Sequence, residues 1–397
     1  MSDKDPIVIV GAARTPMGGF QGVLKDVSAP ELGGIAIKAA VERAGIAPED
    51  VDDVIMGLCL FAGVKQAPAR QAAHNAGLPW DTGCTTISKM CGSAMKAAML
   101  AHDNILAGSH DIMVAGGMES MTNSPYVLQR ARNGYRLGHG DLVKDHMFLD
   151  GLEDAYQEGR LMGTFAEDTA EHYQFTREAQ DEFAITSLVR AKKAVEDGTF
   201  APEVQPVTVA SRKGDVVVAH DEQPFNANID KIPQLKPAFR KDGTVTPANS
   251  SSISDGAAAL VLMKRSEAEK RGLTPLAVIH AHSTHANPPE WFTTAPVGAI
   301  EKVLARTGWT ADEVDLYEIN EAFAVVTMAA MRDLGLPHEK VNVHGGACAL
   351  GHPVGASGAR IVVTLLNALQ KYGLKRGVAS LCIGGGEATA LAIERVA

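Results

Sequence analysis

Four side chains stand where proteins commonly place groups that do chemistry. Cys91 and Cys382 each lie at the end of an apolar run, His352 lies in a glycine-rich loop, and Asn320 opens the segment NEAFA. Together they supply a nucleophile, a base and a polar orienting group, which is the set that acyl transfer requires. Each of them, taken alone, also has an ordinary structural explanation.

Cys91 follows a short strand-like run that ends at Met90, and a helix rich in glycine, serine and alanine is expected after it. The free N–H groups and the dipole at a helix N-terminus favour a thiolate there. The alternative is a buried structural cysteine, which is what most free cysteines are.

His352 precedes Pro353, whose ring biases the histidine backbone toward an extended form. The glycines around it would let the backbone approach a ligand, but neither GxGxxG nor GxxxxGK[ST] can be written through them. These residues leave His352 either facing a ligand or hydrogen-bonded within its own loop.

Cys382 comes just before three glycines, Gly384, Gly385 and Gly386, whose N–H groups could point at a developing oxyanion. Asn320 follows an expected strand and precedes an expected helix. Its alternative role is therefore that of a helix N-cap.

An internal repeat indicates which elements position these groups. The segments that begin at Arg43 and Arg306 share an arginine, a glycine, a valine and an aspartate without a gap, 263 residues apart. A second echo, DIMVAGGMES and ASLCIGGGEAT, is spaced by 268 residues and pairs Cys382 with Val114. Helices that lead into apolar strands in both copies predict an α/β fold with mixed or parallel sheets.

The repeat predicts three units. Residues 1–120, with a returning strand in 254–273, form the first half, and residues 274–397 form the second. Residues 121–253 form an inserted domain, since their aromatic side chains need burial and a long amphipathic helix begins at Arg177.

Composition excludes several classes of protein. The 397 residues are 46% hydrophobic with a formal net charge of −10 and no basic block, which argues against nucleic acid as a partner. No run of 18 apolar residues and no signal or transit pattern is present, so we expect no membrane association. Five cysteines without a CxxC pair indicate reduced thiols, a cytoplasmic protein and no metal site.

The motifs taken together resemble the thiolase family, most closely its biosynthetic branch of acetyl-CoA acetyltransferases. The segments that carry the resemblance are KMCGSAMKA, MVAGGMESM, NEAFA, GGACALGHPVGASGAR and CIGGGEA, in the family order and over essentially the whole chain. It implies a thiolase-like five-layer α/β/α/β/α fold of two repeated halves, with an inserted loop domain that binds coenzyme A. It also implies a homo-oligomer, a dimer or a tetramer.

The implied reaction is the reversible Claisen condensation of two acetyl-CoA to acetoacetyl-CoA and CoA, or thiolysis of a short 3-oxoacyl-CoA. It would run as a ping-pong scheme through an acyl-cysteine, with coenzyme A as a substrate and no cofactor. By resemblance, Cys91 is the nucleophile, His352 is the base that activates it, and Cys382 is the acid/base at the substrate α-carbon. His352 Nε2 and a water held by Asn320 would form one oxyanion hole, and the N–H groups of Cys91 and Gly384 the other. The implied substrate contacts are Ser251, Phe239, Ala322, Phe323 and Met162.

The sequence departs from the family pattern at the outer substrate contacts. Leu161 replaces a frequent histidine and Pro224 a frequent arginine, so we expect weak recognition of the adenine end of CoA. Phe292 replaces a frequent methionine beside the acyl pocket, where its ring either favours short acyl chains or repacks. The cations Lys213, Lys231, Arg240 and Lys241 either meet phosphates or are solvated surface.

Two rival functions fit the residues less well, and one part of the chain is expected to form a subunit interface. A ketoacyl-carrier-protein synthase would pair the cysteine with two histidines or with histidine and asparagine, and Cys382 opposes this. A non-catalytic acyl-CoA binding protein would not need all three catalytic side chains. The apolar segments MVAGGMES and TTISKM are expected to form a subunit interface beside the site.

Overall fold

The chain forms one continuous sheet whose two ends belong to the two halves of the sequence. The computed structural model describes residues 5–139 and 143–396, and within them ten strands pair in the order β12-β13-β14-β11-β1-β10-β5-β3-β4, with β2 beside β10. The first-half strands are β1 (Ile7–Arg14), β2 (Gly18–Gly19), β3 (Asp53–Gly57), β4 (Gly83–Ile87), β5 (Ile112–Ser120) and β10 (Ser254–Lys264). The second-half strands are β11 (Ala277–Ala286), β12 (Leu316–Ile319), β13 (Arg376–Ile383) and β14 (Glu387–Arg395). The pairs Val8–Val278 and Ile9–Ala277 join β1 to β11 across the seam.

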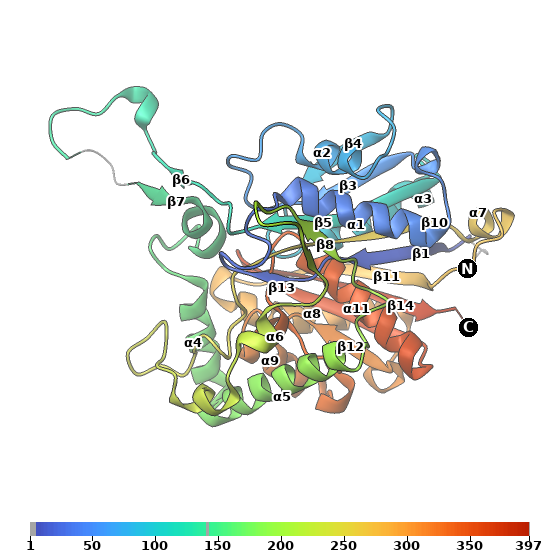
Figure 1. Ribbon diagram of the computed structural model, residues 1–397. Helices are drawn as coiled ribbons and strands as arrows, with labels where there is room; N and C mark the ends of the chain where they lie inside the picture. The colour runs from blue at the N-terminus through green and yellow to red at the C-terminus, as the bar shows by residue number, and fades with distance from the viewer. Residues whose placement is uncertain (1–4, 140–142, 397) are drawn as a thin grey trace.

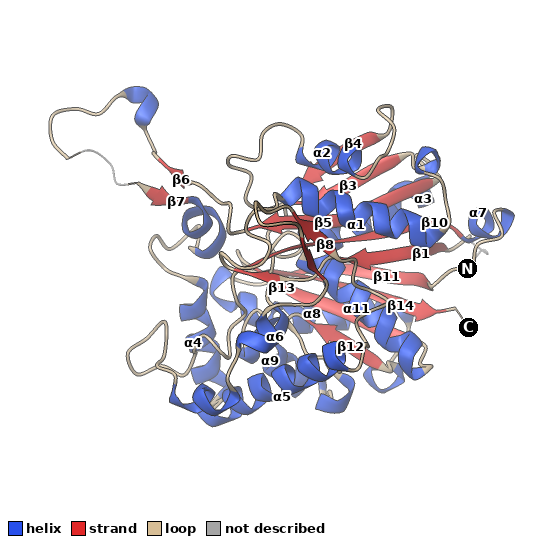
Figure 2. Ribbon diagram, in the orientation of Figure 1, coloured by secondary structure: helices blue, strands red, loops and turns tan. Residues whose placement is uncertain are grey.

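Helices cover both outer faces and fill the space between the halves (Figures 1 and 2). The outer helices are α1 (Ala29–Ala44), α2 (Pro68–Asn75), α8 (Ala295–Thr307) and α9 (Ala324–Leu334), and the central ones are α3 (Ser93–Ala107) and α11 (Ser357–Tyr372). Three apolar clusters separate the layers: one under α1 and α2, one around α3 and α11, and one under α8. The predicted five-layer α/β/α/β/α arrangement is confirmed.

The strands that lie between two helical layers are apolar on both faces, as buried strands must be. In β10 the side chains alternate between two clusters with the period of a strand. The outer cluster receives Ala257, Ala259, Val261 and Met263, and the central cluster receives Ala258, Leu260 and Leu262.

The small residues of α3 let it approach α11 closely. A Cβ atom added at Gly358 of α11 would lie 2.4 Å from the backbone nitrogen of Met95 in α3, so only glycine fits there. Because α3 begins beside Cys91 and α11 begins beside the His352 loop, this contact fixes the two loops relative to each other.

The segment 121–253 leaves the first half after β5 and rejoins it through β10. It contains β6 (Tyr126–Val127), β7 (Lys144–Asp145), α4 (Met162–Tyr173), α5 (Arg177–Glu196), β8 (Val207–Val209), β9 (Val216–Val218) and α6 (Gln223–Asn226). The predicted helix from Arg177 is confirmed as α5, and the predicted returning strand as β10, which lies between β1 and β5. Two short helices lie outside this segment: α7 (Arg265–Lys270) follows β10, and α10 (Ala347–Leu350) precedes α11. The domain borders at 120, 254 and 273 stay a prediction.

The first repeat found in the sequence is a repeat of structure. Gly45 and Gly308 end α1 and α8 in the left-handed conformation, with φ of 72° and 74°. The guanidinium groups of Arg43 and Arg306 each donate to a backbone carbonyl of the facing strand, in β1 and β11.

The two segments of the second echo do not occupy equivalent positions in the two halves. Strand pairing places Met113 opposite Asp53 and Gly377 opposite Leu316, so equivalent positions of β5 and β13 are 264 residues apart, not 268. The first-half equivalent of Cys382 is therefore Met118, and the predicted pairing with Val114 is wrong. The two segments were matched on their glycines. The glycines of the first segment are strand residues of β5, whereas those of the second segment form the turn after β13.

Of the two segments expected at a subunit interface, one lies inside the sheet and the other at its edge. MVAGGMES lies in β5, which is buried along its whole length between β10 and β3, so that part of the prediction is wrong. β4, which contains Thr85, Thr86 and Ile87, is the last strand of the sheet and is partly exposed.

Among the described residues, no helix is long and apolar enough to cross a bilayer.

Asp315 offers a test of the structural repeat. Its Oδ2 accepts the N–H groups of Lys375 and Arg376 at 2.9 and 2.8 Å, as Asp52 Oδ2 accepts those of Asp111 and Ile112 in the first half. We expect Asp315→Ala to lower the free energy of unfolding by about 1–3 kcal/mol, because two N–H groups at the start of β13 lose a charged acceptor. Denaturant unfolding measures this, with the exposed Asp312→Ala as control. Equal stability of the two variants would contradict the assignment.

Candidate active site

A cavity of about 240 Å³ lies where loops of both halves meet the inserted segment. Of the residues predicted from the sequence, it is lined by Cys91, His352, Gly384, Ser251, Phe239, Ala322, Phe323 and Met162. Asn320 and Cys382 are fully buried beside it and do not line its wall. All ten predicted positions therefore gather at one place, although they come from segments spread along the chain from Cys91 to Gly384.

Cys91 lies in a tight turn between β4 and α3. The turn depends on Met90, which has φ of 46°, a rare conformation for a residue with a side chain. The Met90 carbonyl accepts hydrogen bonds from Ser93 Oγ at 2.6 Å and Cys59 Sγ at 3.0 Å, and Ser93 Oγ accepts the N–H of Lys89 at 2.8 Å. These contacts hold the strained residue next to the thiol.

Gly92 brings this turn against the end of β13. A Cβ atom added at Gly92 would lie 2.4 Å from Cδ1 of Ile383, the residue after Cys382. The ion pair between Lys89 Nζ and Glu387 Oε2, at 2.6 Å, joins the same two turns from the outside. The two thiols are close enough for the charge of Cys91 to disfavour ionisation of Cys382.

The electrostatics of Cys91 differ from the prediction. α3 begins at Ser93, so the expected helix N-terminus is present. However, burial raises the pKa of the Cys91 thiol, and the N–H groups of Gly384 and of Cys91 itself oppose this only in part. Loss of solvent therefore outweighs the helix N-terminus, which favours a thiolate, in its effect on this pKa.

His352 is buried and neutral. Burial first, and the charge of Arg360 second, lower the pKa of its imidazole to about 3. Nδ1 lies 2.5 Å from Ser357 Oγ, and that hydroxyl donates to the Pro353 carbonyl at 3.0 Å. Since the hydroxyl hydrogen is already used, Nδ1 carries the proton that it donates to Ser357. Nε2 has no partner among the described residues, so its lone pair is free to accept a proton.

Asn320 is not a helix N-cap, because α9 begins at Ala324 with Phe323 as its cap. Its Oδ1 accepts a hydrogen bond from Arg360 Nη2 at 3.3 Å, and its Nδ2 lies 3.5 Å from His352 Nδ1. Arg360 is itself buried and pairs with Glu318 at 3.6 Å. A buried cation therefore orients Asn320 and keeps His352 uncharged.

Cys382 is the penultimate residue of β13, close to the predicted strand end, and the turn to β14 is made by glycines. Gly385 and Gly386 have φ of 94° and 100°, which other residues rarely adopt. The N–H of Gly384, the first glycine of this turn, faces the sulfur of Cys91. Burial, followed by the charge of Cys91, raises the pKa of Cys382 well above its usual value, so both thiols rest protonated.

Glu119 is a site residue that was not predicted from the sequence, although it lies in the second echo. This buried carboxylate of β5 accepts the N–H groups of Cys59 at 3.0 Å, Leu60 at 3.2 Å and Gly355 at 2.9 Å. Burial raises its pKa to about 7 against the effect of these bonds. It thereby joins the loop behind Cys91 to the loop that carries His352.

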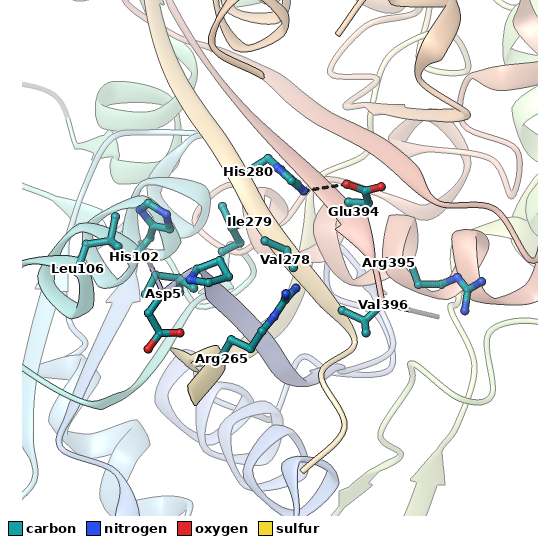
Figure 3. Close-up of a pocket in the computed structure, with 12 residues that line it drawn as sticks. Asp5, His102, Leu106, Arg265, Val278, Ile279, His280, Glu394, Arg395 and Val396 are labelled. Atoms are coloured by element: carbon teal, nitrogen blue, oxygen red, sulfur yellow. Dashed lines mark ion pairs between the residues drawn. The ribbon is translucent and has the colours of Figure 1, made fainter. Parts of the chain in front are cut away.

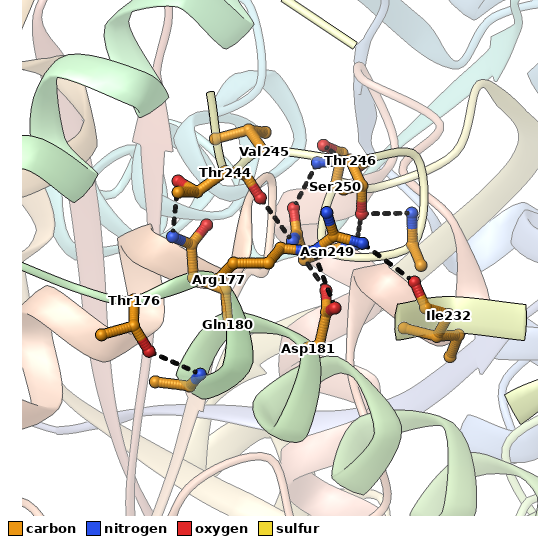
Figure 4. A network of polar contacts seen from close by, with 12 residues as sticks. Thr176, Arg177, Gln180, Asp181, Ile232, Thr244, Val245, Thr246, Asn249 and Ser250 are labelled. Carbon is orange, nitrogen blue, oxygen red and sulfur yellow. Dashed lines mark hydrogen bonds and ion pairs between the residues drawn. The ribbon is translucent and has the colours of Figure 1, made fainter. Parts of the chain in front are cut away.

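A second polar network positions the substrate side of the cavity (Figure 4). Asp181 of α5 pairs with Arg177 at 2.7 Å and accepts from Asn249 Nδ2 at 3.1 Å. Asn249 Oδ1 in turn accepts the N–H of Thr246 at 2.7 Å. The chain then passes to Ser251, whose N–H donates to the Ala322 carbonyl at 2.9 Å. Helix α5 therefore places Ser251 against the NEAFA segment.

The apolar wall is aromatic. Phe239 and Phe323 meet edge to face with ring centroids 6.0 Å apart, and Phe165 and Phe292 do so at 6.1 Å. Phe292, which replaces the frequent methionine, is 2% exposed and lines the cavity, so its ring limits the space in the same cavity as Cys91.

None of the four cations considered as candidates to meet phosphates, with solvated surface as the alternative, lines this cavity. Arg240 pairs instead with Asp168 and Glu171, so its charge is already engaged. Lys213, Lys231 and Lys241 stay predictions. Among the described residues, the one grouping of metal-type ligands, His102, Asp103 and His282, does not line the cavity.

Residues 7–266 match the thiolase N-terminal domain and residues 273–395 the thiolase C-terminal domain. The chain belongs to the thiolase family. The resemblance seen in the sequence is thus confirmed.

Related thiolases match over nearly their whole length. An acetyl-CoA acetyltransferase of Cupriavidus necator is 50% identical over 98% of this chain and 99% of its own. The cytosolic acetyl-CoA acetyltransferase of Mus musculus is 48% identical over 99% of both chains. The crystal structure of the Bacillus anthracis acetyl-CoA acetyltransferase superposes with a TM-score of 0.96 at 43% identity, covering 99% of each chain. The Acat5 thiolase of Ascaris suum in complex with coenzyme A has a TM-score of 0.92 at 40% identity, covering 98% of this chain and 100% of its own.

The protonation states give a pH prediction for this thiolase. We expect the rate of alkylation of Cys91 by iodoacetamide to rise steadily above pH 9, with no step near pH 6.5. The reason is that the thiol pKa is raised and His352, with a pKa of about 3, stays neutral throughout that range. Peptide mapping would separate Cys91 from the other thiols. A plateau that begins near pH 6 would instead reveal a thiolate–imidazolium pair and contradict the account.

Proposed function

We propose that this thiolase is an acetyl-CoA acetyltransferase that condenses two acetyl-CoA to acetoacetyl-CoA and CoA through an acetyl group on Cys91. The observation that carries the proposal is that Cys91 and the free Nε2 of His352 line one apolar cavity, with the buried thiol of Cys382 directly behind its wall. A Claisen condensation requires both an electrophilic acyl carrier and a base at an α-carbon, and two thiols supply these separately.

In the first half-reaction, Cys91 Sγ attacks the thioester carbon while His352 Nε2 takes the thiol proton. The negative oxygen that forms is stabilised by the N–H groups of Cys91 and Gly384, which already point to this sulfur in the resting site. The carbon–sulfur bond to CoA then breaks. Cys382, a thiol at rest, gives its proton to the departing CoA sulfur and becomes a thiolate.

In the second half-reaction, the Cys382 thiolate removes an α-proton from a second acetyl-CoA. His352 now carries the proton taken from Cys91, so its Nε2–H can donate to the enolate oxygen, together with a water held by Asn320. The α-carbon attacks the acetyl carbon and the bond to Cys91 breaks. His352 returns its proton to Cys91, and both thiols and the neutral imidazole are restored.

This proton path explains why burial of the thiols suits the reaction. If Cys382 rested as a thiolate, it would have no proton to give to the CoA sulfur. If Cys91 did so, the cycle would not start with neutral groups, and His352 would have no thiol proton to take. Thiolysis of a 3-oxoacyl-CoA is the same sequence in reverse, with Cys382 as the acid that protonates the departing carbon.

The cavity walls support short acyl chains as substrates. The ring of Phe292 occupies space beside the acyl site, and the channel wall of Phe239, Ser251, Ala322, Phe323 and Met162 supports binding of the pantetheine arm. Leu161 also lines the cavity and has no polar group for CoA, which fits weak recognition of the outer substrate. Coenzyme A acts here as a substrate, and the proposal needs no cofactor.

The two thiols are distinguished by replacing each with serine. We expect Cys91→Ser to abolish acetyl-enzyme formation, because an alcohol is a far weaker nucleophile at neutral pH. Cys382→Ser should still allow acetylation of Cys91, since CoA can leave as a thiolate, but should lower condensation by about 10²–10⁴-fold. Intact-protein mass spectrometry after mixing with acetyl-CoA, and an assay of acetoacetyl-CoA formation, measure the two steps.

Cys84→Ser is the matched control, because this thiol lies in β4 and does not line the cavity. Loss of the acetyl adduct in Cys382→Ser, with labelling of Cys382 in Cys91→Ser, would reverse the assignment. An adduct without any turnover of acetoacetyl-CoA in the unaltered protein would favour a non-catalytic binding protein.

We also propose that the chain acts as a cytosolic homo-oligomer, a dimer or a tetramer. Two features support self-association. β4 leaves one edge of the sheet unpaired by the described chain, and such edges pair readily with a second strand. The ribbon of β6 and β7 projects from the body in Figure 1 and exposes the apolar side chains Tyr126, Leu128, Tyr135, Leu137 and Val143.

Sedimentation velocity tests the assembly. We expect a species of at least twice 41.8 kDa at micromolar concentration. Thr85→Pro should weaken it, because proline removes a backbone donor from the edge strand. Replacement of exposed Val217, in β9, with proline is the control, since β9 belongs to a separate two-stranded sheet. A monomer at that concentration would contradict the proposal.

A further inference from the structure

A histidine–aspartate–histidine cluster lies at the seam between the halves, away from the acetyl-transfer site. His102 and Asp103 come from α3 and His282 from β11. Asp103 Oδ1 lies 3.0 Å from His102 Nδ1 and 2.9 Å from His282 Nε2, and the three donor atoms lie within 4.8 Å of one another. One carboxylate oxygen thus serves two imidazoles from opposite halves of the chain.

The cluster is anchored on one side and open on the other. The side chains of His102 and His282 are 12% and 14% exposed, whereas Asp103 is 52% exposed. The two rings meet edge to face with centroids 5.0 Å apart, which fixes the directions of their nitrogens. His102 also lies on the wall of a surface cavity of about 540 Å³, shown in Figure 3, through which an ion and solvent can enter.

The arrangement of the donor atoms suits a cation. Asp103 Oδ1 is in hydrogen-bond contact with His102 Nδ1 and His282 Nε2, so two imidazole nitrogens and one carboxylate oxygen face a common point. An ion that binds there takes the place of the protons that these hydrogen bonds share.

We propose that His102 Nδ1, Asp103 Oδ1 and His282 Nε2 bind a divalent transition-metal ion of the zinc class. Two imidazoles and one carboxylate are a usual ligand set for Zn²⁺, with solvent in the fourth position. Mg²⁺ and Ca²⁺ prefer sets made wholly of oxygen, which this cluster does not offer. The ion would join α3, which begins two residues after Cys91, to β11 of the second half. It would stabilise the docking of the two halves and take no part in acetyl transfer.

Titration with Co²⁺ tests the site, because its absorption bands report the ligand atoms. The full-length protein, treated with a chelator and then freed of it, should bind Co²⁺ with a spectrum of nitrogen and oxygen ligation, and added Zn²⁺ should displace it. His102→Asn and His282→Asn should each weaken binding by at least about tenfold. His280→Asn is the matched control: this histidine lies two residues along the same strand and pairs with Glu394 at 2.9 Å (Figure 3).

The same variants give a second measurement. Zn²⁺ should raise the melting temperature of the unaltered protein and of His280→Asn, but not of His102→Asn or His282→Asn, because an ion that binds the folded state stabilises it. Acetyl transfer by the variants shows that they are folded. The proposal is wrong if either cluster variant binds Co²⁺ as tightly as the control, or if the spectrum shows sulfur ligation by the active-site thiols.

Discussion

The site depends on one buried carboxylate. Glu119 receives three backbone N–H groups, from Cys59, Leu60 and Gly355, at a point where water cannot replace them. Cys59 then supports the strained Met90 next to the nucleophile, and Gly355 belongs to the loop of the catalytic histidine. An unpaired N–H in this interior would cost about 1–3 kcal/mol, so the two loops are held in one arrangement. The geometry of Cys91 relative to His352 follows from an interaction that neither residue makes.

Burial also decides the chemistry. The helix N-terminus beside Cys91 favours a thiolate, but removal of solvent from the thiols and the imidazole favours their neutral forms, and the second effect is larger. The buried Arg360 acts in the same direction on His352. In a site that starts neutral, each thiol keeps a proton. In the proposed cycle the Cys382 proton goes to the departing CoA sulfur, and the Cys91 proton, held by His352, is donated in a hydrogen bond to the enolate oxygen.

Much of this could be predicted from the sequence, since the information is local. Cys91, His352 and Cys382 lie at element ends that composition and glycines mark, and the alternating apolar pattern of a strand such as β10 reflects helices on both of its faces. Glu119, Ser357 and Arg360 were missed, because their importance comes from partners that are far away in the chain, such as Cys59 for Glu119. The pairing of Cys382 with Val114 failed for a related reason: glycine runs look alike whether they form a strand or a turn, and the hydrogen bonds that distinguish them are tertiary. The apolar MVAGGMES segment was assigned to an interface because an internal strand and an interface strand have the same composition.

The most direct test of the central claim is the single-turnover rate of Cys91 acetylation in Glu119→Gln. The amide keeps the size of the side chain, and its one oxygen can still accept from Cys59 and Gly355, but its NH₂ group then faces the N–H of Leu60, so the loop behind Cys91 must shift. We expect acetylation to slow by about tenfold to a hundredfold, as misplacement by about 1 Å does in other enzymes, while the protein remains folded by circular dichroism. Acetylation at the unaltered rate would show that the site does not depend on this carboxylate.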